Sequence, residues 1–278
     1  MTPSSTKSSA GTTIDEVATF LERFAPVELA AEWDNVGLLM GDRAAKVERI
    51  ATCLTVTDAV VAEAVAERVD LLVSHHPLPF RAQKKLTTDT HDGRRLWRLA
   101  SAGVAIYSPH TAFDSAAEGI NLRLAEGLGL SDIRPLVPLG PEIDTKFGSG
   151  LGIGRQGGIV PGITLAQLVT RAKTFLKIPT IGVVGADDRL ISKVAVGCGS
   201  AADHLGDASR AGCDCFVTGE ASFHKLVEAE AADMALLVVG HYASERFGVE
   251  RLAEVIQSAF AHLTVWPARR EQDPLRYA

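Results

Sequence analysis

Two eleven-residue stretches decide the fold of this chain: VAIYSPHTAFD at residues 104–114 and ALLVVGHYASE at residues 235–245. Each begins with an apolar run typical of a buried β-strand and then passes into His-x-x-x-carboxylate with the same spacing. The preceding regions match as well, because strand-like segments at residues 50–56 and 194–197 are each followed by a helix-like segment and a second short strand. We therefore predict an internal duplication.

The alternation of short apolar strands with amphipathic helices predicts an α/β protein, with parallel strands covered by helices on both faces. A capping box at Thr13-x-x-Glu16 marks the start of the first helix. Proline and glycine interrupt the alternation between residues 131 and 158, which marks the best candidate boundary. We expect a loose leader over residues 1–12, a first α/β half over residues 13–135 and a second α/β half over residues 136–278.

Composition describes a globular protein without indicating its chemistry: the 278 residues are 46% apolar and 22% charged. The chain has 28 Lys and Arg against 34 Asp and Glu, a net charge of −6 that argues against non-specific nucleic-acid binding. No apolar run approaches the roughly 18–20 residues of a membrane span, and the start lacks the apolar centre of a signal peptide. With four cysteines and no C-x-x-C pair, we expect a cytoplasmic protein that binds no membrane.

Histidines and carboxylates follow the predicted strands, where ligands of α/β sheets gather. His75 and His76 come directly after a short buried strand, and Asp114, His241 and Glu245 lie just beyond two others. Imidazole and carboxylate suit Zn²⁺, Fe²⁺, Mn²⁺ or Ni²⁺. Because three histidines and two carboxylates exceed what one open ion needs, we predict two divalent metal ions per chain, bridged by Glu245.

Other polar residues allow two interpretations. His110 and Glu220 would either hydrogen-bond to the metal ligands or transfer protons directly. Asp34 forms either a turn or a lip over the site, and His224 belongs either to the site or to the surface.

Two glycine-rich segments also need an assignment. Gly152-x-Gly154-x-x-Gly157 has the letters of a dinucleotide fingerprint, but no helix follows it, so we predict a hairpin or a bulge. Ser200-x-x-Asp203 is predicted to be a capping box, whose free amides would either simply start a helix or also hold a phosphate.

Five motifs together resemble the NGG-one-interacting-factor-three-like family, whose members are often labelled GTP cyclohydrolase I type 2 homologues. They are EWDNVGLL at residues 32–39, DLLVSHHP at 70–77, HTAFD at 110–114, TGE at 218–220 and GHYASER at 240–246. The resemblance implies two similar, intertwined three-layer α/β/α domains, a dinuclear metal centre between them and a homo-hexameric ring. It places the ligands on the same five residues: His75, His76, Asp114, His241 and Glu245.

The leading hypothesis is a metal-dependent hydrolase acting on a nucleotide or another phosphorylated small molecule, with Glu220 or His110 moving protons. GTP ring opening is the specific reaction that the family label implies. The alternative is a non-enzymatic protein that binds or delivers metal. A third hypothesis, a ring-shaped scaffold around nucleic acid, is disfavoured by the net charge of −6.

Overall fold

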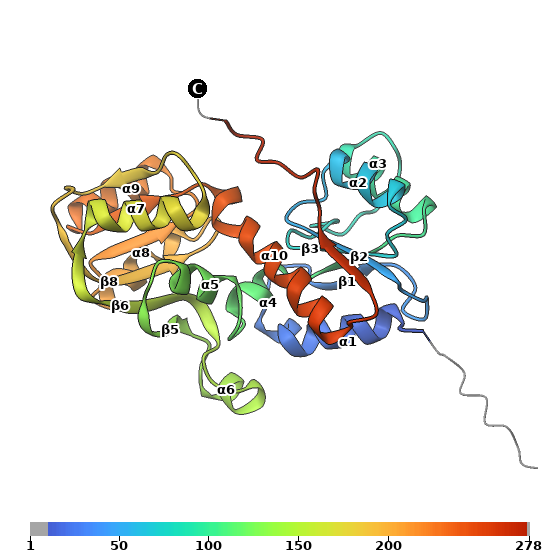
Figure 1. Cartoon of the computed structure of the whole chain (residues 1–278), viewed down its shortest axis with the longest axis horizontal. Coiled ribbons are helices and arrows are strands. Elements are labelled where there is room, and N and C mark those ends of the chain that lie inside the picture. Colours follow the sequence, from blue (N-terminus) through green and yellow to red (C-terminus); the bar gives the residue numbers. More distant parts are fainter. Residues whose placement is uncertain (1–10, 277–278) are drawn as a thin grey trace, which may run out of the picture.

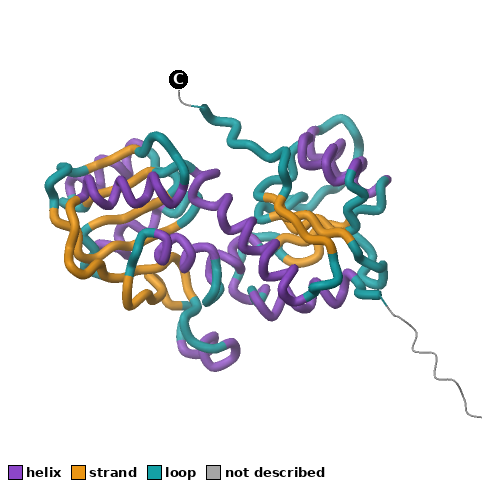
Figure 2. The backbone as a smooth tube through the Cα atoms, viewed as in Figure 1, coloured by secondary structure: helices purple, strands orange, loops and turns teal. Residues whose placement is uncertain are grey.

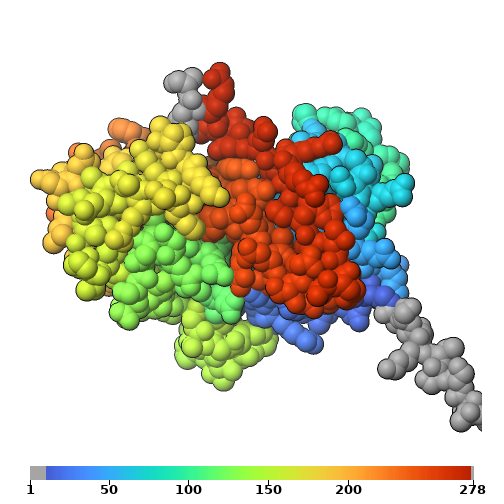
Figure 3. Space-filling view, in the orientation of Figure 1, coloured from blue at the N-terminus to red at the C-terminus, as the bar shows by residue number. Residues whose placement is uncertain are grey.

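A computed structural model of the chain describes residues 11–276 and shows two lobes, each built on one β-sheet. Blue and cyan elements form most of one lobe in Figure 1, and yellow and orange elements form most of the other. The long helix α10 (His241–Ala259) runs from the second lobe to the first, and its red surface fills the seam between them in Figure 3. Residues 1–10 of the predicted leader lie outside the described residues.

The sheet of the first lobe takes four strands from the first part of the chain and one from its end. They are β1 (Gly37–Met40), β2 (Arg49–Cys53), β3 (Leu71–Ser74), β4 (Ala105–Ser108) and β11 (Thr264–Pro267). The spatial order is β1-β4-β3-β2-β11, and all pairs are parallel except β1 with β4.

The sheet of the second lobe has six strands. They are β5 (Ser131–Pro138), β6 (Gly152–Thr164), β7 (Gly182–Val184), β8 (Leu190–Gly197), β9 (Cys215–Thr218) and β10 (Ala235–Val238). The order is β5-β6-β8-β9-β10-β7, with a parallel centre and antiparallel strands on both sides. The glycine-rich segment Gly152–Gly157 lies in β6, whose register with β8 shifts only beyond it, between Gly158 and Ile163.

Helices lie against both faces of the sheets, as Figure 2 shows. The remaining α-helices are α1 (Ile14–Phe24), α2 (Asp58–Ala66), α3 (His91–Ser101), α4 (His110–Ser115), α5 (Ile120–Gly127), α6 (Pro141–Phe147), α7 (Leu165–Leu176), α8 (Leu205–Arg210) and α9 (Phe223–Ala231). Short 3₁₀ turns occupy Val27–Leu29 and Ala202–His204. The capping box of Thr13 and Glu16 is confirmed. Among the described residues, no helix is both long and apolar enough to cross a membrane.

The two sheets share a topology. Strands β2, β3 and β4 neighbour one another in the same order as β8, β9 and β10, and an antiparallel edge strand lies beside the last of each set. Asp70 accepts hydrogen bonds of 2.8 and 2.9 Å from two backbone N–H groups at the start of β2. Asp214 accepts two hydrogen bonds of 2.8 Å from the backbone N–H groups of Ser192 and Lys193 within β8. These correspondences support the predicted duplication, which stays a prediction, while the α/β class with two sheets is confirmed.

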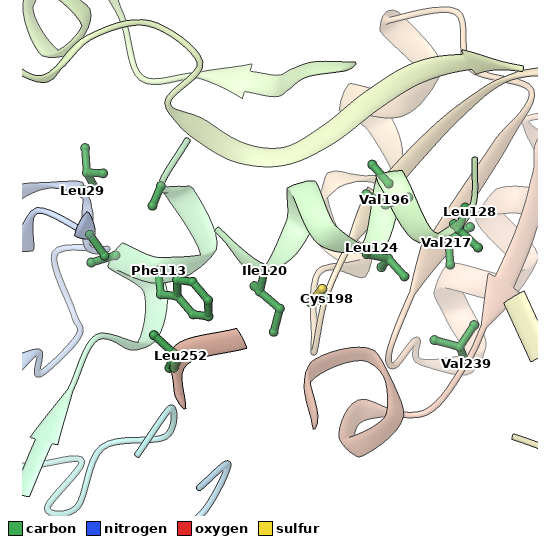
Figure 4. Packing of buried hydrophobic residues seen from close by; sticks show 14 of the residues in the cluster. Leu29, Phe113, Ile120, Leu124, Leu128, Val196, Cys198, Val217, Val239 and Leu252 are labelled. Atoms are coloured by element: carbon green, nitrogen blue, oxygen red, sulfur yellow. The ribbon is translucent and has the colours of Figure 1, made fainter. Parts of the chain in front are cut away.

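One apolar core joins the lobes. Successive residues of β3 point to opposite faces, so that Leu71 contributes to the shared core and Leu72 packs on the side of α2 and α3. Figure 4 shows Phe113, Ile120 and Leu124 of α4 and α5 following one another through the shared core. Burial on both faces explains why these strands are continuous apolar runs.

Sequence order and sheet membership diverge at two places. The expected boundary between residues 135 and 136 falls inside β5, all of which pairs with β6. Strand β11 returns from the second half of the chain to pair with β2. Extended backbone at Ala116 ends α4, and α5 begins at Ile120.

Candidate metal centre

Side chains from both lobes converge where the carboxyl ends of the parallel strands meet. They are His75, His76, His110, Asp114, His241 and Glu245. The first two directly follow β3, and the next two lie on α4, which begins just after β4. The last two lie on α10, which begins just after β10, so each sheet contributes ligands at the equivalent edge.

A first group surrounds one carboxylate oxygen. The Nε2 atoms of His76 and His241 each lie 3.0 Å from Oε2 of Glu245. The two nitrogens are only 3.3 Å apart. The three ligand atoms lie within 4.8 Å of one another, a spacing that would allow them to hold one ion.

A second group adjoins the first and shares His76 with it. The ligand atoms of His75, His76 and His110 also lie within 4.8 Å of one another. Nε2 of His75 lies 3.6 Å from Oδ1 of Asp114 and 3.8 Å from Oε1 of Glu245. These distances are too long for hydrogen bonds. Because both groups contain His76, the geometry is compatible with two adjacent ions.

Unpartnered polar atoms show that these residues suit a metal. The His75 side chain is only 1% exposed, yet neither of its ring nitrogens has a hydrogen-bond partner among the described residues. Oδ1 of Asp114 is likewise buried and unpartnered, although its side chain as a whole is 26% exposed. Because buried polar atoms without partners are rare and costly, the donor set fits a divalent cation that would occupy them.

The pKa values of three cluster residues are shifted in ways that favour positive charge at the cluster. Burial, together with the charge of the nearby Glu245 carboxylate, raises the pKa of Asp114 to about 7. The hydrogen bond to Glu245 raises the pKa of His241 to about 9. Burial acts to raise the pKa of Glu245 itself, but the surrounding imidazoles outweigh burial and hold it well below its usual value. A buried carboxylate that stays ionised beside three imidazoles is a strong cation ligand.

His110 is fixed by the loop that carries Trp33. Its Nδ1 lies 2.8 Å from both carboxylate oxygens of Asp34, whose side chain is fully buried. The Asp34 carboxylate also accepts a 2.5 Å hydrogen bond from the Thr111 hydroxyl. His110 has a backbone φ of 25°, a strained value that clusters at functional sites. Asp34 thus orients an imidazole whose Nε2 remains available as a ligand.

His76 is oriented from the C-terminal segment through Thr55. The Thr55 hydroxyl lies 2.7 Å from Nδ1 of His76. The backbone N–H groups of Leu54 and Thr55 donate to the buried Glu271 carboxylate at 2.9 and 2.6 Å. The sequence reasoning missed both Thr55 and Glu271. The position of Thr55 just beyond the carboxyl end of β2 was the available signal for it, whereas nothing local distinguishes Glu271.

Glu220 connects His241 to the surface. One of its oxygens lies 3.1 Å from Nδ1 of His241, and the other accepts a 2.8 Å hydrogen bond from Ser200. Its side chain is 56% exposed. The predicted capping box at Ser200 is wrong, because the Ser200 hydroxyl binds Glu220 and the following turn is a 3₁₀ turn without a side-chain cap. An N-terminal phosphate site there has no support in this geometry.

Two cavities meet at the cluster, and His76, Ser200 and His241 line both. The Trp33 cavity, of about 640 Å³, is lined by Trp33, Phe80, His110, Asp114 and Glu245 together with apolar residues. The Lys225 cavity, of about 880 Å³, is lined by Glu220, Lys225, Asp203 and Asp273 among others. Both volumes fall in the range of small-molecule sites.

Gly199 closes the cluster from the second lobe. It has a φ of +59°, and a Cβ atom at this position would lie 2.2 Å from Oε1 of Glu245. Its N–H donates a 2.9 Å hydrogen bond to the Ser244 hydroxyl. The glycine is therefore required both by backbone conformation and by the close approach of Glu245.

The five predicted ligands are brought together by the structure, and their ligand role stays a prediction. The sequence placed His241 just beyond a strand, and in the structure it is the first residue of α10, which follows β10. His110 joins a group of candidate ligands, a position that the two interpretations offered for it did not include. His224 is exposed on α9 and lines neither cavity.

Comparison with known proteins gives one consistent result. A family model described as Duf34/NIF3 (NGG1p interacting factor 3) matches residues 12–274. A Clostridium acetobutylicum protein named GTP cyclohydrolase 1 type 2 homolog is 32% identical over 246 residues, covering 88% of this chain and 90% of that protein. The Protein NIF3 homolog of Schizosaccharomyces pombe is 33% identical over 226 residues, covering 79% and 80%.

Solved structures agree on the fold. A Bacillus cereus protein related to NIF3 has a TM-score of 0.87 at 22% identity, covering 96% of this chain and 99% of that one. Reduced HcgD from Methanocaldococcus jannaschii has a TM-score of 0.77 at 26% identity, covering 93% and 98%.

Proposed function

This chain belongs to the Duf34/NIF3 family, and from that premise we propose that it is a metal-dependent hydrolase with two adjacent divalent ions. The observation that carries the proposal is the pair of ligand groups sharing His76, with unpartnered atoms of His75 and Asp114 buried among them. The first ion would be held by His76, His241 and Glu245. The second would be held by His75 together with Asp114 or His110, with Glu245 within reach of both.

The chemistry that such ions supply when bound is Lewis-acid polarisation of the attacked bond and a water that ionises near neutral pH. The chain's own residues would orient the ligands and transfer protons. Asp34 holds Nδ1 of His110, which keeps the ring facing the cluster. Glu220 touches His241 and is more than half exposed, so it can pass a proton from the cluster to solvent in the Lys225 cavity.

The substrate class in this proposal is a nucleotide or another phosphorylated small molecule. Several relatives carry the name GTP cyclohydrolase 1 type 2 homolog, which makes GTP the first compound to assay. The two cavities support a small-molecule substrate, because both are lined by candidate ligands and both have volumes in the range of small-molecule sites.

The test combines metal analysis with turnover. Purified chain loaded with Zn²⁺, Fe²⁺, Mn²⁺ or Ni²⁺ should hold about two ions per chain by elemental analysis and should hydrolyse GTP, another nucleotide or a phosphoester. The doubly substituted variant His76→Ala, Glu245→Ala should lose both ions and the activity. A matched control is Glu142→Ala, which alters an exposed carboxylate on α6 outside both cavities.

Two outcomes would contradict the proposal. Retention of both ions by the double variant would refute the ligand assignment. Full metal occupancy without turnover of any compound would refute the hydrolase and favour a protein that binds or delivers metal. Transfer of the ions to a partner protein would then support that alternative. A homo-hexamer remains part of the proposal from family membership, and light scattering on the purified chain tests it.

A further inference from the structure

We propose that Trp33 and Phe80 form a ring-binding subsite at the Trp33 cavity, where a planar aromatic group of the substrate stacks beside the metal centre. This inference deepens the proposed function and rests on it for the identity of the bound molecule as a substrate. It concerns a surface that the metal ligands do not explain.

Two large aromatic side chains stay exposed at this cavity. Trp33 is 64% exposed and Phe80 is 41% exposed, and both line the same cavity as His110. Their ring centroids lie 5.9 Å apart, and the His110 ring lies 6.1 Å from Trp33 and 6.3 Å from Phe80. Adjacent exposed aromatic rings mark binding surfaces in soluble proteins, because water contact with so much apolar area is unfavourable.

The two rings are mounted rigidly although they come from different loops. Trp33, Asp34 and Asn35 are consecutive, and the last two are each held by a different segment of the chain. The Asp34 carboxylate holds His110 at 2.8 Å, while the Asn35 amide donates a 2.7 Å hydrogen bond to the Pro79 carbonyl next to Phe80. A prearranged surface of this kind loses little entropy on binding.

The lining specifies the chemistry of the occupant. Among the described residues lining the Trp33 cavity there is no Lys or Arg, so its walls supply no permanent cation for a polyphosphate. Leu29, Leu139 and Phe216 add apolar wall instead. The Trp33 and Phe80 planes are inclined at 54°, so a bound ring can stack on one and meet the other at its edge. The occupant is therefore a flat, uncharged heteroaromatic ring such as a nucleobase.

The experiment measures binding of nucleosides to the full-length, metal-loaded chain by calorimetry. Adenosine and guanosine are the aromatic probes, and ribose, which lacks both base and phosphate, is the non-aromatic probe. Stacking on an aromatic side chain contributes about 1–3 kcal/mol per base, which corresponds to roughly 5- to 150-fold in affinity. We expect Trp33→Ala to weaken nucleoside binding within that range, and Trp33→Phe to restore most of it.

A matched control is available in the same chain. Trp97 lies on α3, is 53% exposed and lines neither cavity, so Trp97→Ala should leave nucleoside binding unchanged. Trp33→Ala should keep the metal content of the unsubstituted chain, since Trp33 contributes no ligand atom. Elemental analysis of each variant separates loss of the ring subsite from loss of the centre.

Three results would overturn the subsite. These are unchanged nucleoside binding by Trp33→Ala, equal binding of ribose, or a change of oligomeric state in Trp33→Ala showing that a second copy covers the ring. The outcomes also separate the two proposals. Nucleoside binding without any turnover would keep the subsite and refute the hydrolase, whereas hydrolysis of only non-aromatic phosphoesters would keep the hydrolase and refute the subsite.

Discussion

Raising the pH from 7 to 9 should strengthen metal binding, because His241 must lose a proton before it can act as a ligand. The hydrogen bond to Glu245 raises the pKa of His241 to about 9, so in the metal-free protein the ring is an imidazolium at pH 7. A cation must displace that proton. At about two pH units below the pKa, the displacement costs about 2.7 kcal/mol, or roughly 100-fold in apparent affinity. The side chain is 32% exposed, so solvent screening makes this an upper value.

The dependence on pH has a predicted shape. Apparent affinity should rise about tenfold per pH unit between 7 and 9 and level off above 9, where His241 is already neutral. Below pH 7 binding of the second ion should weaken as well, because burial raises the pKa of Asp114 to about 7 and this carboxyl must be deprotonated to act as a ligand. Lower pH therefore weakens binding at both groups.

The assay is a Zn²⁺ titration against a competing chelator whose own affinity is known at each pH. Calorimetry in buffers of different ionisation enthalpy counts the protons released. Glu220→Gln serves as a comparison, because the Glu220 charge contributes to the raised pKa of His241 and its removal should move the plateau to lower pH. An affinity that does not change between pH 7 and 9, or the same slope in His241→Ala, would refute the reasoning.

Three further predictions concern single residues. Gly199→Ala should lower the metal content measured by elemental analysis, because the new Cβ would lie 2.2 Å from Oε1 of Glu245. Gly206→Ala is the control and should leave the metal content unchanged, because its Cβ would meet only the flexible end of Arg210 at 3.4 Å. Glu271→Ala should reduce the free energy of unfolding by about 1–3 kcal/mol in urea, since two backbone N–H groups lose their acceptor, and an unchanged value would contradict the assigned hydrogen bonds. Tyr107→Phe should leave that free energy within about 1 kcal/mol or raise it, because the buried hydroxyl has no partner among the described residues, and a loss above 2 kcal/mol would show a partner that the geometry lacks.

Much of the local structure followed from short-range patterns. The short buried strand predicted before His75 is confirmed as Leu71–Ser74, because a continuous apolar run with Pro77 soon after it leaves few alternatives. The helix starts at Thr13, Thr57 and Thr164 were likewise predictable, since a capping side chain acts within three residues. The capping box predicted at Ser200 is wrong because the Ser200 hydroxyl donates to Glu220 instead. Glu220 is twenty residues away in the sequence, so no local pattern indicates this contact.

The membership of the cluster was partly readable from sequence. Strand ends carrying histidine and carboxylate point to one edge of a sheet, and that rule alone selected His75, His76, Asp114, His241 and Glu245. The same rule could not tell which of these residues share an ion. It also could not rank His110 among candidate ligands, because its position depends on Asp34 from a loop seventy-six residues earlier.

By itself, the sequence determined the α/β class, the matching strand–helix units and the side-chain types of the candidate centre, because these depend on periodicity and on residues close together in the chain. Only the tertiary structure decided that β11 returns to the first sheet and that β5 belongs to the second. It alone joined Glu271 to the backbone beside His76 and placed Trp33 beside Phe80 at a cavity mouth. These contacts connect distant segments through packing of the whole chain, and no local propensity encodes which distant partner a residue will meet.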